Sequence, residues 1–206
     1  MIAIIDYGVG NLRSVEKAFL NVGYEAVVTN KKEDILQADG VVLPGVGAFG
    51  DAMENIRQAG LLEPIRAVVK DGTPFLGICL GMQLLFATSE EHGLHEGLNF
   101  IPGHVRRFQG DFKIPQVGWN QLQFKREHPI LDGVTEGSHV YFVHSYYVDP
   151  QDSAVVLAST DYFQDVPAIV AKDNVIGIQF HPEKSSHIGL RLLANFGKLV
   201  TREVVL

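Results

Sequence analysis

Hydrophobic positions in the first half of the chain follow two alternating periods, which indicates strands that alternate with helices. Short apolar runs, typical of buried strands, occupy residues 2–6, 25–28, 40–43 and 74–78. The stretches between them carry apolar residues at helical spacing, which predicts helices over 11–22, within 48–70 on either side of Gly60, and over 82–88. Strands and helices in this order are joined by right-handed crossovers, so we expect a mostly parallel central sheet with flanking helices.

The second half of the chain has a different pattern. Short alternating or apolar runs, separated by turns rich in Gly, Pro and Asp, occupy residues 105–108, 117–124, 139–143, 154–158, 168–171 and 175–180. Such runs predict antiparallel strands added to the parallel sheet. An amphipathic pattern over residues 188–200 predicts a closing helix. We therefore expect an α/β fold that forms one domain over residues 1–206, without repeats or linkers.

Composition and charge narrow the class of protein. With 206 residues, 46% of them hydrophobic and 20% charged, the chain can bury a substantial core. Its apolar runs fall well short of the ~20 residues that span a bilayer, and its first residues resemble a strand more than a signal peptide. A formal net charge of −7 argues against nucleic acid and membrane surfaces as partners. A single cysteine forms no intrachain disulfide, so we expect a cytoplasmic protein.

That cysteine, Cys79, lies in the segment FLGICLGMQ of residues 75–83. An apolar run precedes it and a glycine lies two residues to either side. This is the pattern of a nucleophile elbow, where a strand turns sharply into a helix and exposes one reactive side chain. Amides at the start of the following helix favour the thiolate that attacks a substrate. The alternative is a cysteine buried in the core, where free cysteines often lie.

A second segment, far along the chain, supplies the groups that a cysteine nucleophile needs. The apolar run of residues 176–180 leads directly into His181-Pro182-Glu183. A nucleophilic thiol needs a base within hydrogen-bond reach and a third group that orients the base. Because Pro182 restricts the backbone, His181 and Glu183 can point to the same side. The motif by itself also fits a surface histidine beside a strand end, but together with the elbow it indicates a Cys-His-Glu triad.

Three other patterns are less specific. The segment LPGVGAFG of residues 43–50 can present backbone amides to an oxyanion, or it can form an ordinary strand-to-helix turn. The segment DYGVGN of residues 6–11 lacks the third glycine of a dinucleotide fingerprint, since Arg13 stands there, so it is interpreted as a turn that opens a helix. His92 and His95 lie in a polar stretch without a nearby cysteine, and we expect neither a metal site nor a cofactor.

Taken together, the motifs resemble those of a known family. The segments GICLGMQ (77–83) and QFHPE (179–183) resemble the class I glutamine amidotransferases, which have a flavodoxin-like α/β fold. More narrowly, four further segments are similar to the glutaminase subunits of imidazole glycerol phosphate synthases. They are DYGVGNL (6–12), LPGVG (43–47), GWN (118–120) and YFVHSY (141–146). The resemblance extends from the first strand to the last helix.

The resemblance implies a mechanism. Cys79 would attack the side-chain amide of glutamine, His181 would transfer the protons and Glu183 would orient His181. The backbone amides of Leu80 and Val46 would stabilise the oxyanion. The wider superfamily usually carries Pro-Gly-Gly where this chain has Pro-Gly-Val, so we hypothesise that residues 44–47 idle in a non-productive conformation until a partner binds.

The resemblance also implies contacts with substrate and partner. The substrate glutamine would contact a set of five residues: Gly47, Gln83, Glu91, Ser145 and Tyr146. Four positions match residues that face the synthase subunit in this family: Asn11, Trp119, Tyr141 and Lys184. That partner is a (β/α)8 cyclase, which takes ammonia through a protected passage and makes imidazole glycerol phosphate and aminoimidazole carboxamide ribotide in histidine biosynthesis.

Three other interpretations stay open from the sequence. A different cysteine hydrolase on a similar fold would leave Gln83 without a role and often lacks the adjoining His-Pro-Glu. A catalytically silent binding module would be expected to have lost one of the three triad residues. A glutaminase that serves another pathway is the nearest rival, and the Gly-Trp-Asn and Pro-Gly-Val-Gly segments argue against it.

Overall fold

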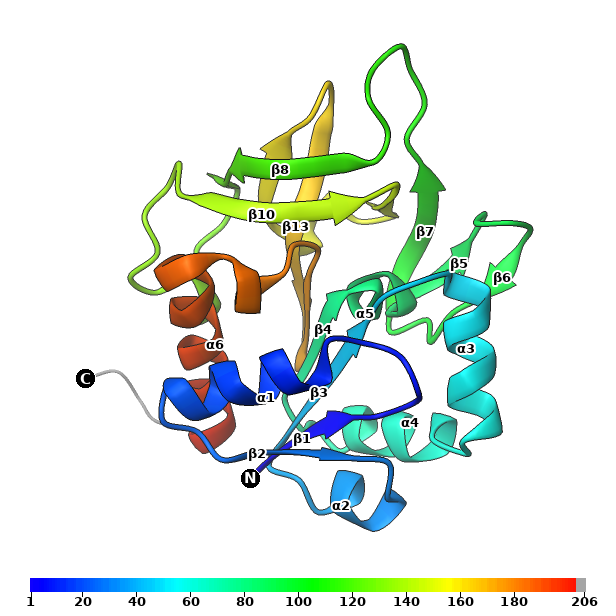
Figure 1. The fold of residues 1–206 in the computed structure, drawn as a ribbon, viewed down its shortest axis with the longest axis vertical. Helices are drawn as coiled ribbons and strands as arrows, with labels where there is room; N and C mark the ends of the chain where they lie inside the picture. The colour runs from blue at the N-terminus through cyan, green and yellow to red at the C-terminus, as the bar shows by residue number, and fades with distance from the viewer. Residues whose placement is uncertain (203–206) are drawn as a thin grey trace.

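A computed structural model describes residues 1–202 and is built around an eight-stranded sheet (Figure 1). Its strand order is β2 (Ala26–Thr29), β1 (Ile2–Ile5), β3 (Gly40–Gly45), β4 (Phe75–Cys79), β14 (Val175–Ile178), β13 (Asp165–Lys172), β12 (Val156–Asp161) and β9 (Gln123–Phe124). The five strands from β2 to β14 are parallel, and the last three are antiparallel to their neighbours. The predicted mostly parallel sheet with added antiparallel strands is therefore confirmed.

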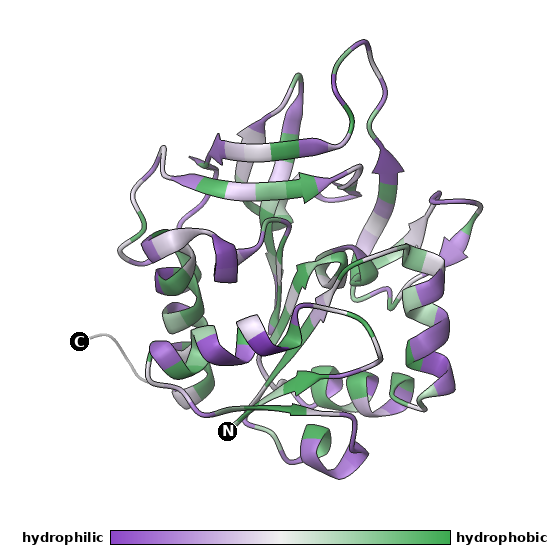
Figure 2. Cartoon of the chain, in the orientation of Figure 1, coloured by the Kyte–Doolittle hydropathy of each residue, from purple (hydrophilic) through white to green (hydrophobic). Residues whose placement is uncertain are grey.

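Helices cover both faces of the parallel strands, because alternate residues of each strand point to opposite faces. Ile2 and Ile4 of β1 belong to one core cluster, together with residues of α1 (Leu12–Asn21) and α6 (Ser186–Thr201). Ala3 and Ile5 belong to a second cluster, on the face that carries α2 (Lys32–Leu36), α3 (Phe49–Gln58), α4 (Leu62–Lys70) and α5 (Leu80–Leu84). All four residues of β1 are buried, as expected for a strand covered on both faces. Figure 2 shows these central strands as hydrophobic and the outer sides of the helices as hydrophilic.

The remaining strands form two further sheets. The runs at residues 105–108, 117–124 and 139–143 were predicted to join the central sheet, but only 123–124 does so, and the strands at 86–89, 95–96 and 146–150 were not predicted. One is a ribbon of β8 (Gln116–Gln121) and β10 (His139–His144), and the other has the order β11 (Tyr146–Pro150), β7 (Ile101–Arg107), β5 (Phe86–Ser89) and β6 (His95–Glu96). Short 3-10 helices follow at η1 (Pro129–Leu131), η2 (Ser153–Val155) and η3 (Pro182–Lys184).

Two boundary predictions were wrong for a tertiary reason. The helix expected over residues 82–88 ends at Leu84, because Phe86–Ser89 pairs with β7 as strand β5. The strand expected over residues 154–158 starts at Val156, after a 3-10 turn in which the Asp152 side chain caps the amide of Ala154. Pairing with a distant strand overrode the apolar pattern at the first boundary. A local side-chain cap overrode it at the second.

The carboxyl ends of the parallel strands meet at one edge of the sheet, where ligands bind in open α/β folds. Tyr7 follows β1, Val46 follows β3, Cys79 ends β4, and His181 lies three residues beyond β14. Among residues 1–202, the structure contains no helix with the length and apolarity needed to cross a membrane.

Candidate active site

Cys79 occupies a strained turn between β4 and α5. Its φ of 55° lies in the left-handed region that side chains rarely adopt, as expected for the nucleophile of an elbow. The flanking glycines allow this close crossing: a Cβ on Gly77 would lie 2.6 Å from the carbonyl oxygen of Gly81, and a Cβ on Gly81 would overlap that of Leu43. Cys79 is 8% exposed. Cys79 also belongs to a core cluster, so the turn places a largely buried side chain at the edge of the sheet.

His181 and Glu183 form the base side of the site. His181 Nδ1 and Glu183 Oε1 are 2.8 Å apart, and the side chains are only 3% and 1% exposed. Asn11, which precedes α1, donates from Nδ2 to the same carboxylate oxygen at 3.2 Å. Glu183 therefore fixes the imidazole ring of His181, and Asn11 fixes Glu183 in turn. A carboxylate in this position orients a catalytic base.

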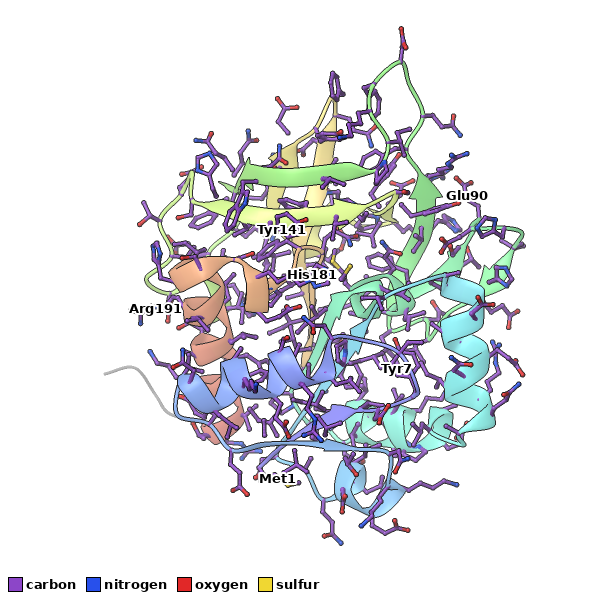
Figure 3. The ribbon with its side chains drawn as sticks, in the orientation of Figure 1. Met1, Tyr7, Glu90, Tyr141, His181 and Arg191 are labelled. Carbon is purple, nitrogen blue, oxygen red and sulfur yellow. The ribbon has the colours of Figure 1, made fainter. Side chains whose placement is uncertain are left out.

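The backbone around His181 is also tied to strand β10. The amide of His181 donates to the carbonyl of Tyr141 at 3.1 Å. Buried Ser185 completes the connection, because its hydroxyl donates to the His181 carbonyl at 2.7 Å and accepts from the Tyr141 amide at 3.0 Å. Figure 3 shows Tyr141 and His181 on these neighbouring elements.

The electrostatics of His181 link it to the nucleophile. Burial by itself lowers the pKa of His181, but hydrogen bonds to Cys79 and Glu183 and the negative charges of both groups outweigh burial and raise the pKa to about 9. Burial opposes ionisation of Glu183 too, yet the bond to His181 holds the pKa of that carboxyl below its ordinary value. His181 is therefore held as a charged imidazolium beside the Glu183 carboxylate, within hydrogen-bond reach of the Cys79 sulfur.

A cavity of about 880 Å³ opens beside Cys79 and His181. All the residues predicted to form the oxyanion hole or contact glutamine line it: Val46, Gly47, Leu80, Gln83, Glu91, Ser145 and Tyr146. Glu183 lies behind the imidazole, outside the lining. The structure thus brings together segments that are far apart in the sequence at one concave site, which is the usual form of a small-molecule pocket.

Two of the predicted substrate contacts have their own partners. Gln83 is buried and donates from Nε2 to the carbonyl of Tyr146 at 3.0 Å and to Gln179 Oε1 at 3.1 Å. Glu91 Oε2 accepts from the amide of Phe49, at the start of α3, at 2.7 Å. These bonds fix both side chains before any ligand enters.

The four positions expected to face a partner fall into two groups. Trp119 and Tyr141 are cross-strand neighbours on β8 and β10, with ring centroids 5.9 Å apart, and Lys184 is exposed at the end of η3. Asn11 is less simple than expected, because its side chain is bonded to Glu183 of the base side.

Sequence analysis missed several cavity residues. Glu90, Arg107 and Gln109 also line the cavity, and only folding brings them there. His144, within the segment YFVHSY, was assigned no role from the sequence. It donates from Nδ1 to the Tyr146 carbonyl at 2.7 Å, and burial lowers its pKa to about 4, so it stays neutral. Tyr7 was treated as part of a turn, but its buried hydroxyl donates to the carbonyl of Pro44 at 2.9 Å. Among residues 1–202, no cluster of three His, Cys, Asp or Glu residues could hold a metal ion.

Comparison with known proteins identifies the family of the chain. The family model "Glutamine amidotransferase class-I" matches residues 3–199, so the chain belongs to the class I glutamine amidotransferase family. Two similar relatives carry the name "Imidazole glycerol phosphate synthase subunit HisH". The protein of Syntrophotalea carbinolica is 55% identical, and the match covers 97% of this chain and 100% of the relative. The protein of Geobacter metallireducens is 56% identical, and the match covers 95% of this chain and 96% of the relative.

Solved structures agree on the fold. "Crystal structure of glutamine amidotransferase" superimposes with a TM-score of 0.77 at 22% identity, covering 98% of this chain and all of that one. "Structure of PurLQS from Thermotoga maritima" gives 0.72 at 20% identity, covering 98% and 97%. The predicted family, the fold class and the assignment to a class of glutamine-hydrolysing enzymes are therefore confirmed.

Proposed function

We propose that this chain is the glutaminase subunit of an imidazole glycerol phosphate synthase. It hydrolyses glutamine to glutamate and delivers ammonia to a cyclase subunit with a (β/α)8 barrel, in histidine biosynthesis. The observation that carries this proposal is that Cys79 and His181 line one cavity, with Glu183 bonded to His181 from behind, in a chain about 55% identical to subunits of that name.

The first half of the reaction transfers the glutamyl group to sulfur. The Cys79 thiolate attacks the carboxamide carbon, and the carbonyl oxygen becomes an oxyanion that accepts from the amides of Leu80 and Val46. His181, charged by the thiol proton, gives that proton to the amide nitrogen, and the C–N bond breaks to release ammonia and a thioester. Glu183, held by Asn11, keeps Nδ1 of the ring engaged, so that Nε2 is free for these proton transfers.

The second half releases glutamate. Neutral His181 takes a proton from water, the hydroxide oxygen attacks the thioester, and the C–S bond breaks to give glutamate and the thiolate. Ammonia released into bulk water would be protonated and diluted, so it must be handed over directly to the next reaction. That requirement explains why a docked partner with a closed passage is expected.

Substrate recognition uses the walls of the same cavity. The carboxylate of Glu91 faces the cavity and provides a negative charge for the ammonium of glutamine. Gln83 orients the backbone of Tyr146, and Gly47, Ser145 and Tyr146 line the side where the amino-acid end of the substrate would lie.

The surface around the cavity supports the docking of a partner. Exposed apolar residues gather on the outward face of the β8–β10 ribbon: Trp119 is 52% exposed, Val117 46% and Val143 36%. Val143 also lines the cavity, and Val46, 42% exposed, lies at its rim. A large exposed apolar patch marks an interaction site, and this one, with Tyr141, Lys184 and Asn11 nearby, would seal the cavity under a cyclase. We further propose that residues 1–206 form one domain and that the protein works in the cytoplasm.

Glutamate release from glutamine tests the proposal directly. The full chain is assayed alone and with the cyclase subunit of the same organism, with and without its nucleotide ligand. We expect slow release by the chain alone and much faster release in the complex with ligand. Release at the full rate by the isolated chain would refute the idling of residues 44–47, and no release under any condition would refute the glutaminase assignment.

A further inference from the structure

Tyr7 packs against the end of β3, close to Cys79, and has no role in the mechanism above. It is two residues beyond the end of β1, at the same sheet edge as Cys79, which ends β4. Its side chain is 4% exposed and belongs to the core cluster that contains Leu43, Phe49 and Leu80. A buried phenol needs a hydrogen-bond partner, since an unpaired hydroxyl would be costly to bury.

That partner is the strand that provides the oxyanion donor. The Tyr7 hydroxyl donates to the carbonyl oxygen of Pro44 at 2.9 Å. This carbonyl and the amide of Gly45 belong to the same planar peptide unit, so the bond fixes the orientation of both. A Cβ on Gly45 would overlap the hydroxyl and lie 3.1 Å from the amide nitrogen of Gly81. The phenol therefore fills the space between the end of β3 and the elbow, and a glycine at position 45 leaves that space open.

The hydroxyl is a permanent donor. Burial raises the pKa of Tyr7 above its ordinary value, and the nearby negative charge of Cys79 raises it further. Tyr7 is consequently protonated at neutral pH and well above it, so its bond to Pro44 persists through the working pH range.

Burial changes abruptly just beyond this bond. Pro44 and Gly45 are buried, whereas Val46 is 42% exposed and Gly47, with a φ of 95°, is exposed as well. Turning the Val46 amide toward or away from Cys79 requires rotation of the Gly45–Val46 peptide. That peptide adjoins the unit that Tyr7 holds, so any tilt transmitted to Pro44 weakens the Tyr7 bond.

We propose that Tyr7 is a positioning residue for the oxyanion donor: its hydroxyl holds the Pro44–Gly45 peptide unit, and this hold opposes the rearrangement that presents the Val46 amide to the substrate. The inference rests on the proposed glutaminase function. It adds a residue that sets the equilibrium between the idle and active conformations of residues 44–47. A partner shifts the equilibrium between the idle and active conformations only by binding the active one more tightly. That preference must be large enough to offset the hydrogen bond between Tyr7 and Pro44.

Tyr7→Phe tests this with little change in packing. A neutral hydrogen bond contributes about 1 kcal/mol, which corresponds to a factor of about five. We expect glutamate release by the variant chain alone to rise about fivefold, while release in the complex with the cyclase and its ligand stays within about twofold of wild type. The ratio of the rate in the complex to the rate of the chain alone should therefore fall. A simple loss of folding stability in the variant would not lower this ratio.

A second measurement does not depend on the activity. Hydrogen exchange of the Gly45 amide, followed by NMR in the isolated chain, should accelerate about fivefold in Tyr7→Phe. The matched control is Tyr162→Phe, which also removes a tyrosine hydroxyl that donates to a backbone carbonyl, that of Lys113 at 2.6 Å, outside the cavity lining. Neither the rate ratio nor Gly45 exchange should change in the control.

The outcomes separate the two proposals. Unchanged exchange at Gly45 in Tyr7→Phe, or a rate ratio equal to that of wild type, overturns the role of Tyr7 even if the chain is a glutaminase. If neither protein releases glutamate under any condition, the glutaminase function fails, and the exchange measurement still decides whether the hydroxyl holds the strand.

Discussion

The two halves of the candidate site differ in how firmly the fold holds them. On the base side, His181 is fixed through its ring by Glu183 and through its backbone by Tyr141 and Ser185, and all these contacts are buried or nearly so. On the oxyanion side, the backbone is buried as far as Gly45, where Tyr7 holds it through Pro44, and then emerges at Val46 and Gly47.

This difference indicates where control of the activity resides. A preorganised base costs no reorganisation during the reaction, so the triad can be complete before a partner arrives. A segment that is exposed and rich in glycine can exchange between conformations at small cost, and a docked partner can select one of them. We therefore expect substitutions on the base side to reduce every rate, and substitutions on the oxyanion side to change the ratio of rates with and without the partner.

The largest effect is expected at the nucleophile. Cys79→Ala removes the attacking sulfur, so glutamate release should fall at least about ten-thousandfold, alone and in the complex. Cyclase binding, measured by isothermal titration calorimetry, should stay unchanged because the side chain is small and only 8% exposed. Residual release that the partner still stimulates would show that another group attacks the amide.

The base and its orienting group should differ in importance. His181→Ala removes the proton transfer, whereas Glu183→Gln keeps a hydrogen-bond acceptor and loses only the charge. The loss in kcat/KM for Glu183→Gln should be roughly a hundredfold smaller than for His181→Ala. Both losses should be equal with and without the partner, and a loss confined to the complex would contradict the view that the base side is preformed.

The partner surface should contribute affinity and leave the chemistry intact. Trp119→Ala removes a large exposed aromatic, and a central aromatic at an interface is worth about 2 kcal/mol, or a roughly thirtyfold rise in the Kd for the cyclase. Glutamate release at saturating partner should be unchanged. Leu36→Ala, at a residue 52% exposed on α2, is the control and should not alter the Kd; equal weakening by both variants would place the interface elsewhere.

The smallest expected effect is on the pH dependence of the free energy of unfolding. The pKa of His181 is raised to about 9 in the folded chain, compared with about 6.5 when unfolded. The resulting stabilisation is therefore complete below pH 6.5 and is lost as the pH rises through 9. Glu183→Gln should lower this pKa and shrink the effect, by about 1.4 kcal/mol for each pKa unit lost.

Urea unfolding at pH 6.5, 8 and 9.5 measures this difference. Glu63→Gln, which neutralises an exposed carboxylate on α4, is the control and should keep the wild-type dependence on pH. Identical slopes for wild type and Glu183→Gln would mean that the carboxylate does not sustain the charge on His181.

Local sequence patterns were sufficient for much of this molecule. Apolar runs and helical spacing predicted β1, α1, the helices around Gly60, β4 and α6, because each of these elements buries one face or both against a core. The elbow at Cys79 and the His-Pro-Glu segment could also be predicted from the sequence, since nucleophilic catalysis needs particular residue types at fixed short spacings.

Tertiary structure decided what depends on residues that are distant in the chain. No local pattern could show that Phe86–Ser89 is a strand, because its partner is β7, or that β8 and β10 form a ribbon of their own. The same holds for the site. Tyr7 meets Pro44 because the neighbouring parallel strands β1 and β3 end at the same edge of the sheet, and Asn11 meets Glu183 because α1 packs against η3. Hydrogen bonds of this kind follow from the packing of whole elements rather than from residue order.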